Sequence, residues 1–318
     1  MTPTGRNPHA HGSATDTGAD TGPNTSPGPS PRTSPRTDPD PNTPRETTLS
    51  LDHGDLHVRQ DGPREAPVLL LLHGSAASSS SWDALVPLLT PLHHVIRIDL
   101  PGHGRSAEPD DGDYTTPEQA RRVGTALDRL GVGPVLAVGH SSGGYTATAL
   151  AEQRPDLVTA LTLISTGPGM DAFLAPGSAA FQPERWPPTD EQIRRFASTG
   201  FRAGFEVPQE LVDELRGMTF HALTAAMRAS TAYLEHRALP DRLKPLGKPL
   251  QVIFGEEDRR WSPASAADYR VVPDARVELL PDAGHTPILE DPARTAALLL
   301  PFAGIHTDVG QEQGHDRG

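Results

Sequence analysis

The chain has 318 residues, of which only 35% are hydrophobic, and its 28 basic and 41 acidic residues give a formal net charge of −13. This negative charge argues against a nucleic-acid partner. The chain has no cysteine, which excludes disulfides, cysteine metal ligands and a thiol nucleophile. No segment reaches the roughly 18 apolar residues of a membrane-spanning helix, and no apolar segment follows the first residues as in a secretory signal, so we expect a cytoplasmic protein without a membrane partner.

The first 48 residues differ in composition from the rest of the chain. They contain ten prolines and many Thr, Ser, Gly and Asp residues, but no Val, Ile, Leu or aromatic residue. Such a segment buries too little apolar surface to offset the entropy lost on ordering. We therefore expect residues 1–48 to form a disordered tail; docking of an SH3-like partner to its Pro-rich stretch 26–32 is the alternative.

From residue 49 onward, short apolar runs alternate with helical patterns. Residues 49–51 and 56–58 flank a polar turn, which predicts an antiparallel hairpin. Continuous apolar runs predict further strands that are covered on both faces, as in a parallel sheet. These runs lie at residues 68–72, 95–98, 135–138, 161–164, 250–254 and 277–280. The predicted helices lie at residues 82–89, 117–130, 142–154, 263–270 and 292–302. This alternation predicts an α/β fold with a doubly wound, mostly parallel eight-stranded sheet.

The alternation stops between residues 167 and 240, where the pattern is helical only. Thr189 and Gln192 have the spacing of a capping box, and two more helices are expected at residues 208–216 and 219–236. A helical segment of this size needs a larger domain against which it can bury its apolar face. The expected organisation is a core at residues 49–166 and 241–303, a helical cap at 167–240 and a flexible tail at 304–318.

The most informative motif is Gly139-His140-Ser141-Ser142-Gly143. It follows a predicted strand and precedes a predicted helix, which is the context of a nucleophile elbow. The sharp turn of such an elbow lifts the serine hydroxyl out of the sheet, and close backbone approach favours glycine at positions 139 and 143. The motif therefore predicts that Ser141 is a nucleophile.

Two later residues supply the partners that a serine nucleophile needs. A serine hydroxyl attacks efficiently when a base takes its proton and a carboxylate orients that base. Asp258 follows one predicted strand and His285 follows the next, and the carboxyl ends of parallel strands share one edge of the sheet. The chain order Ser141, Asp258, His285 is also the order expected with such an elbow. We expect these three residues to be catalytic, with Glu256 and Glu257 as alternatives to Asp258.

The negatively charged intermediate of acyl transfer needs hydrogen-bond donors for its oxygen, which form an oxyanion hole. One candidate is the backbone N–H of Ser142, beside the nucleophile. A second is expected in the loop after residues 68–72, where we choose the N–H of Ser75, with Ala76 as the alternative. His103 follows the next strand, and we favour a turn that braces the site entrance over a role for His103 as a base.

Taken together, these motifs resemble those of the α/β-hydrolase fold superfamily, in its serine-nucleophile branch with a helical cap. The matching segments span residues 49–303: they are His73-Gly74, 99–106, 139–144, 255–258 with Pro263, and 284–287 with Glu290 and Pro292. The resemblance implies a Ser141–His285–Asp258 triad, an oxyanion hole and catalysis without a cofactor. Related haloalkane dehalogenases and epoxide hydrolases carry an aspartate nucleophile, so Ser141 argues against those activities.

Aromatic residues concentrate in the predicted cap. Six of the eight phenylalanines lie there, together with Trp186, Met218 and Met227; they are Phe173, Phe181, Phe196, Phe201, Phe205 and Phe220. If these side chains line a concave site, they favour an apolar acyl or aromatic substrate. The alternative is that they form the cap's own small core.

The sequence thus predicts a serine hydrolase that cleaves a small, apolar ester, lactone or related carbonyl compound through an acyl-enzyme. The alternatives are a carbon–carbon bond hydrolase or a cofactor-free perhydrolase with the same triad, a lyase, or a non-catalytic ligand-binding member of the fold. No His, Asp and Glu residues have metal-ligand spacing, and no Gly-rich phosphate loop occurs. We therefore expect a small-molecule substrate, no metal and no phosphorylated ligand.

Overall fold

The computed structural model describes residues 43–174 and 181–307. Strand β1 begins at Arg45, so the predicted boundary at residue 48 lies inside this strand. Branched aliphatic side chains begin only at Leu49, but residues 45–48 join β2 through strand pairing, which needs no such side chains. At the other end, helix α9 continues to Thr307, beyond the predicted limit at residue 303. The remaining parts of the expected disordered tail at 1–48 and of the expected flexible tail at 304–318, which are residues 1–42 and 308–318, lie outside the described residues.

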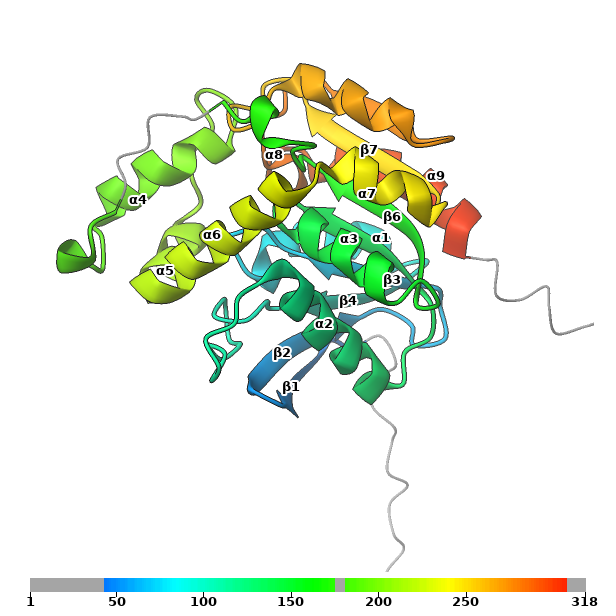
Figure 1. Cartoon of the computed structure of the whole chain (residues 1–318), viewed down its shortest axis with the longest axis horizontal. Coiled ribbons are helices and arrows are strands. Elements are labelled where there is room, and N and C mark those ends of the chain that lie inside the picture. The colour runs from blue at the N-terminus through cyan, green and yellow to red at the C-terminus, as the bar shows by residue number, and fades with distance from the viewer. Residues whose placement is uncertain (1–42, 175–180, 308–318) are drawn as a thin grey trace, which may run out of the picture. The chain divides into compact units, whose positions relative to one another are not determined.

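In the described residues, eight strands form one sheet with the order β1-β2-β4-β3-β5-β6-β7-β8 (Figure 1). The strands are β1 (Arg45–Leu51), β2 (Gly54–Asp61), β3 (Val68–Leu72), β4 (His94–Ile98), β5 (Val135–His140), β6 (Val158–Ile164), β7 (Leu250–Gly255) and β8 (Arg276–Leu280). β1 and β2 form the predicted hairpin, and β2 is antiparallel to β4. The other neighbours are parallel. This order confirms the doubly wound, mostly parallel sheet.

Helices cover both faces of the sheet (Figure 1). They are η1 (Ser79–Trp82), α1 (Val86–Leu89), α2 (Thr116–Leu130), α3 (Gly143–Gln153), α7 (Leu239–Leu243), η5 (Lys244–Leu246), η6 (Pro263–Val271), α8 (Pro287–Glu290) and α9 (Pro292–Thr307). The predicted helix at 82–89 is two short pieces, because Pro87 lacks the N–H that a continuous helix needs and is tolerated only in the first turn of α1. The predicted helix at 263–270 has 3-10 geometry.

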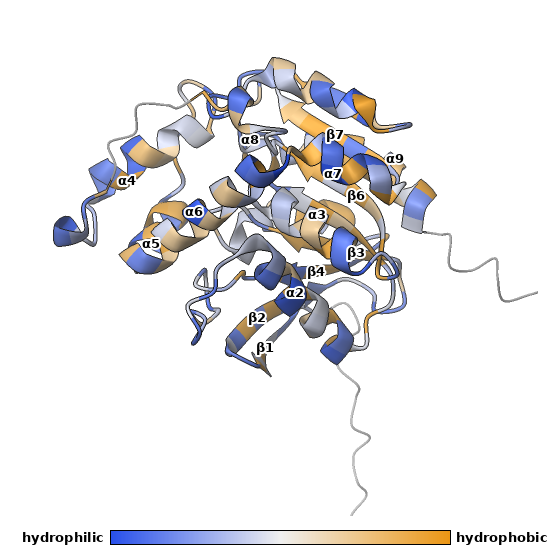
Figure 2. Cartoon of the chain, viewed as in Figure 1, coloured by the Kyte–Doolittle hydropathy of each residue, from blue (hydrophilic) through white to orange (hydrophobic). Residues whose placement is uncertain are grey.

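The two faces of the sheet carry separate hydrophobic cores. Leu70 and Leu72 of β3 pack on the side of α2 and α3, whereas Leu69 and Leu71 pack on the side of α1 and α9. Successive side chains of a strand point to opposite faces, so a strand covered on both faces needs an unbroken apolar run. Figure 2 shows this apolar character along the central strands. The cores hold the carboxyl ends of β5, β7 and β8 at one edge of the sheet.

A helical segment, the cap, is inserted between β6 and α7. It contains η2 (Met170–Ala172), η3 (Pro183–Arg185), α4 (Asp190–Ala197), η4 (Ser198–Gly200), α5 (Gln209–Gly217) and α6 (Phe220–His236). Helix α4 begins with the predicted capping box, in which Thr189 and Gln192 exchange side-chain to backbone hydrogen bonds. The cap has its own core, to which Ile193, Val212 and Leu223 contribute. Its helices lie to one side of the sheet (Figure 1). Residues of α4 and α5 line the same cavity as Ser141.

Candidate active site

Ser141 lies in the sharp turn between β5 and α3. Its φ is +52°, in the left-handed region that residues other than glycine rarely adopt. A Cβ at Gly143 would lie 2.2 Å from the carbonyl oxygen of Leu72, and one at Gly139 would lie 2.5 Å from the carbonyl oxygen of Gly143. Glycine at these two positions therefore meets a steric need, and the strained turn presents the Ser141 hydroxyl beyond the end of the strand.

The structure brings Ser141, His285 and Asp258 together. His285 Nε2 lies 2.9 Å from Ser141 Oγ, and His285 Nδ1 lies 2.8 Å from Asp258 Oδ2. The other carboxylate oxygen of Asp258 accepts the backbone N–H groups of Arg260 and Trp261 at 2.8 and 3.1 Å. The Asp258 side chain is 0% exposed and that of His285 is 2% exposed. An imidazole held in this way directs its Nε2 lone pair at the serine proton.

Glu256 and Glu257, the alternative orienting carboxylates, lie on the same loop but are exposed. The N–H of Asp258 donates to the carbonyl oxygen of Gly255 at 3.2 Å, and this turn directs the Asp258 side chain inward. Within the described residues, Asp258 supplies the carboxylate that bonds to the imidazole of His285.

Glu290 is a buried carboxylate whose role the sequence analysis did not identify. One of its oxygens accepts the N–H groups of Gly284 and Arg202 at 3.0 and 2.9 Å, and the other accepts the N–H of Thr286 at 3.1 Å. Glu290 therefore holds both neighbours of His285 and, through Arg202, the adjoining segment of the cap. The sequence feature that could have indicated this role is the position of Glu290 five residues after His285, directly before Asp291-Pro292, where a helix is expected to break.

The two residues predicted to form the oxyanion hole lie side by side, but one donor is already engaged. The N–H of Ser75 donates to Ser142 Oγ at 2.7 Å, and Ser75 Oγ lies 2.9 Å from the same atom. Ala76, the alternative donor, follows with a φ of +61°. A substrate oxygen that accepts from Ser75 must therefore displace the hydroxyl of Ser142.

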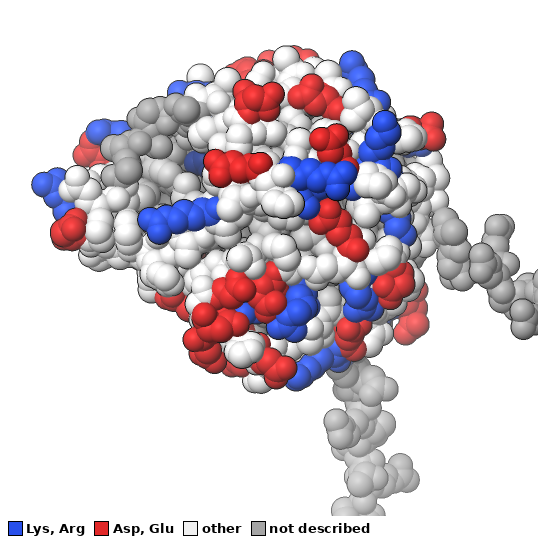
Figure 3. Space-filling view, in the orientation of Figure 1, with Lys and Arg blue, Asp and Glu red and all other residues white. Residues whose placement is uncertain are grey.

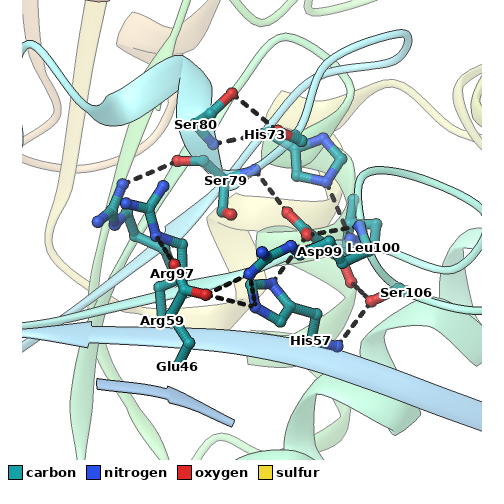
Figure 4. Close-up of polar contacts among 12 residues, drawn as sticks. Glu46, His57, Arg59, His73, Ser79, Ser80, Arg97, Asp99, Leu100 and Ser106 are labelled. Carbon is teal, nitrogen blue, oxygen red and sulfur yellow. Dashed lines mark hydrogen bonds and ion pairs between the residues drawn. The ribbon is translucent and has the colours of Figure 1, made fainter. Parts of the chain in front are cut away.

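A buried polar network holds the loop that carries Ser75 (Figure 4). Asp99 accepts the N–H of Ser79 at 2.6 Å and bonds to His57 Nδ1 at 3.0 Å. His73 Nε2 accepts the N–H of Leu100 at 2.9 Å, while its Nδ1 donates to the carbonyl oxygen of Gly74. These bonds join the loops after β3 and β4, so they fix the backbone on one side of Ser141.

Two more histidines near these loops are buried and neutral. Burial lowers the pKa of His140 to about 3, and His140 Nε2 donates to the carbonyl oxygen of His285 at 2.8 Å. Burial also lowers the pKa of His103 to about 3. His103 Nδ1 donates to the carbonyl oxygen of Pro101 in its own turn, and its ring lies 5.1 Å from that of His73. These contacts suit a bracing role for His103.

Two cavities meet at Ser141. The first, of about 50 Å³, lies under α4 and α5 and is lined by apolar side chains that include Phe196, Phe201 and Leu215. The second, of about 130 Å³, lies beside α3 and α6 and contains both apolar and polar groups. Other aromatic residues of the cap pack on one another instead: the Trp186 ring contacts those of Phe181 and Phe220. The cap aromatics thus divide between a cavity lining and the cap's own core.

The surface charge is mixed on the face drawn in Figure 3, where acidic side chains gather near the N-terminal end of α2. Metal ligands are a separate question from surface charge. Among the described residues, no group of three or more His, Cys, Asp or Glu side chains is placed to hold a metal ion. The described helices also include none that is long and apolar enough to cross a membrane.

The Alpha/beta hydrolase family matches residues 69–298, so the chain belongs to this family. The match spans the elbow and the loops of Asp258 and His285. Membership of this family, together with the named relatives below, makes the protein a hydrolase.

Relatives of known name cover most of the chain. A Bacillus subtilis protein provisionally named 2-succinyl-6-hydroxy-2,4-cyclohexadiene-1-carboxylate synthase is 28% identical, over 77% of this chain and 93% of the relative. The human monoacylglycerol lipase ABHD6 is 27% identical over 77% of each chain. Among solved structures, the N-acyl homoserine lactonase AidH has a TM-score of 0.71 at 21% identity and covers 84% of this chain and 98% of its own, a likeness of fold.

Proposed function

We propose that this protein is a serine hydrolase that cleaves a small ester or lactone through an acyl-enzyme. The observation that carries the proposal is the continuous hydrogen-bonded chain from Ser141 Oγ through His285 to Asp258. The relatives support this chemistry, since one is named a lipase and a structural neighbour a lactonase. The two cavities support a small substrate, because neither reaches the roughly 300 Å³ of pockets that hold drug-sized ligands.

The reaction follows from the positions of these groups. Ser141 Oγ attacks the carbonyl carbon while its proton passes to His285 Nε2, and Asp258 stabilises the resulting imidazolium. The tetrahedral intermediate then expels the alcohol oxygen, which takes the proton from His285, and the acyl group remains on Ser141. Water attacks this ester with His285 again as the base, which releases the carboxylic acid and restores the serine. A lactone gives one hydroxy acid by the same steps.

The backbone N–H groups of Ser142 and Ser75 are the proposed donors to the oxygen that becomes negative. One such donor contributes a factor of about 100 to 1,000 in kcat in serine hydrolases. The Ser75 donor becomes available when the Ser142 hydroxyl turns away from it. No metal or cofactor takes part in the proposed steps.

The proposal is tested with a fluorophosphonate probe and p-nitrophenyl esters of increasing acyl length. We expect stoichiometric labelling of the wild type, no labelling of Ser141→Ala and a loss of kcat of at least about a thousandfold in that variant. Asp258→Asn should keep the fold and lose most of kcat, whereas Glu257→Gln, the matched control on the same loop, should retain it. Labelling of Ser141→Ala equal to that of the wild type would contradict the proposal.

Product analysis in heavy-oxygen water adds a second readout, since one relative is named a synthase. Hydrolysis places one heavy oxygen atom in the carboxylate product, because water attacks the acyl-enzyme. A product without that atom would point to a reaction that consumes no water, and would replace hydrolysis by a lyase reaction.

A further inference from the structure

Arg260 is an arginine beside the candidate active site that has no carboxylate partner among the described residues. The other enclosed arginines are paired: Arg97 lies 2.8 Å from Asp61, and Arg242 lies 3.2 Å from Glu152. Arg260 instead lines both cavities that meet at Ser141. Arg260 is partly buried, and the nearby Asp258 carboxylate, which acts on its charge, already bonds to His285. Taking a cation out of water without a counter-ion of its own is costly, so Arg260 has charge that a ligand could neutralise.

The contacts of the Arg260 guanidinium are few and long. Its Nε lies 3.3 Å from Thr199 Oγ1, and one terminal nitrogen lies 3.4 Å from the carbonyl oxygen of Phe196. Its Cζ also lies 5.3 Å from the centre of the Phe196 ring. A guanidinium has five N–H donors, so most of them have no acceptor within residues 43–174 and 181–307. Burial lowers the pKa of Arg260 and the nearby Asp258 carboxylate raises it, with the effect of burial the larger of the two.

The backbone holds Arg260 in this position. Its N–H donates to Asp258 Oδ1, the carboxylate oxygen that does not contact His285. The same residue that orients the imidazole thus also fixes the start of the Arg260 side chain. This backbone bond places the root of the Arg260 side chain close to the catalytic candidates, while the guanidinium at its end keeps donors for a ligand.

Tyr145 provides a second, independent unpaired donor. It lies one helical turn after Ser141 in α3, lines the second cavity and is only 3% exposed. Its hydroxyl is buried and has no hydrogen-bond partner among the described residues. Burial raises the pKa of Tyr145, so the hydroxyl keeps its proton. A buried hydroxyl without a partner costs free energy unless a ligand supplies an acceptor.

We propose that the substrate carries a carboxylate that binds where the two cavities meet, with Arg260 as its counter-ion and Tyr145 as a hydrogen-bond donor. The Arg260 guanidinium has donors and no acceptor, so its partner on the ligand must be an acceptor, and its positive charge selects an anion. The protonated hydroxyl of Tyr145 can donate to the same group. The apolar first cavity then takes the uncharged arm of the substrate. The substrate class is a small ester or lactone that bears an acid a few bonds from the scissile carbonyl.

This inference rests on the proposed function, because it describes a substrate of the same site. Two matched pairs of esters test it. The first pair, mono-p-nitrophenyl adipate and p-nitrophenyl hexanoate, differs by a carboxylate on the acyl arm. The second, meta-carboxyphenyl butyrate and phenyl butyrate, differs by a carboxylate on the leaving group. The measured quantity is the ratio of kcat/KM for the charged ester to that for the uncharged ester within each pair.

We expect the wild type to favour the charged ester in one pair by at least about tenfold, and that pair identifies the arm that bears the acid. Arg260→Gln should lower this ratio by at least about tenfold, mainly through KM, whereas Arg260→Lys should retain part of it. Tyr145→Phe, which removes only the hydroxyl, should lower it by about threefold to tenfold. A general loss of activity cancels in the ratio, so a variant that only weakens the fold would not mimic this result.

Arg259→Gln is the matched control, because Arg259 is the exposed neighbour of Arg260 and lines neither cavity. Its ratio should equal that of the wild type. A wild-type ratio near one in both pairs, or a ratio unchanged by Arg260→Gln, would overturn the inference. If the inference is overturned but the fluorophosphonate probe labels Ser141 and the uncharged esters are hydrolysed, the proposed serine-hydrolase function still stands. If Ser141 is not labelled, the proposed function itself fails.

Discussion

At the scale of single residues, the hydroxyl of Ser142 competes with the substrate for one donor. It accepts the N–H of Ser75, and the same N–H is the proposed second donor to the substrate oxygen. A small side chain next to the nucleophile can therefore lower activity without touching the reacting atoms. The competing bond must break before the oxyanion hole is complete, so its free energy adds to the barrier.

Ser142→Ala removes this competitor and keeps the backbone N–H of residue 142. A neutral hydrogen bond contributes roughly 0.5–1.5 kcal/mol, so kcat/KM for a p-nitrophenyl ester should rise by about twofold to tenfold. Steady-state kinetics measure the change. Ser75→Ala, which also keeps its backbone N–H, is the control and should have a smaller effect. A lower kcat/KM in Ser142→Ala would mean that the hydroxyl assists the reaction.

At the scale of elements, one carboxylate joins the cap to the loop of the oxyanion hole. Glu214 of α5 accepts the hydroxyl of Ser78 at 2.7 Å, and the hydroxyl of Ser80 donates to the same oxygen. Ser79, between them, is bound to Asp99 of the core. The position of α5 over the first cavity therefore depends on a few polar bonds as well as on apolar packing.

Glu214→Ala removes both bonds, and hydrogen bonds to a charged group contribute roughly 1.5–3 kcal/mol. We expect amide exchange in α5 to become at least about tenfold faster, while exchange in β5 and β6 stays unchanged, because the sheet does not depend on this contact. Hydrogen-exchange mass spectrometry resolves the two regions. Glu210→Ala is the matched control, since Glu210 is exposed on the same helix. Equal protection of α5 in both variants would rule out this role for Glu214.

The sequence predicted the helices and strands and the grouping of Ser141, Asp258 and His285 better than it predicted the residues that surround this group. Strands such as β3 are visible because burial on both faces demands an unbroken apolar run, which is a local property. The juxtaposition of Ser141, Asp258 and His285 follows from parallel strands, whose ends meet at one edge. Arg260 was missed because its contacts come from a distant cap segment, and no local pattern shows which arginine lacks an acid.

At the scale of the whole molecule, buried histidines couple stability to pH. Burial lowers the pKa of His103 and His140 from 6.5 to about 3 each. Burial and the positive charge of Arg64 lower the pKa of His94, which is also buried, to about 4. The folded state therefore binds fewer protons than the unfolded state below pH 6.5. The free energy of unfolding must therefore fall as the pH falls from 6.5 toward these lower pKa values. Above pH 6.5 the buried histidines no longer reduce it, because they are neutral in both states.

Each of His103 and His140 should contribute a slope of about 1.4 kcal/mol per pH unit between roughly pH 6 and pH 4. Denaturant unfolding at several pH values in this range measures the total slope. His103→Gln removes one titrating ring, so the slope should fall by about 1.4 kcal/mol per pH unit, whatever the substitution does to stability at neutral pH. A slope that is zero, or that is the same in His103→Gln, would show that these rings are not held neutral in the folded protein.

The bonds of Glu290 limit how caps can be exchanged between members of this fold. One buried oxygen is shared by the N–H of Gly284, next to His285, and the N–H of Arg202 in the cap. A transplanted cap that lacks an amide at that place would leave part of a buried carboxylate unsatisfied directly beside the imidazole. In a chimera, residues 198–202 should therefore be kept with the core, and the junctions are better placed in the segments on either side of α5 and α6.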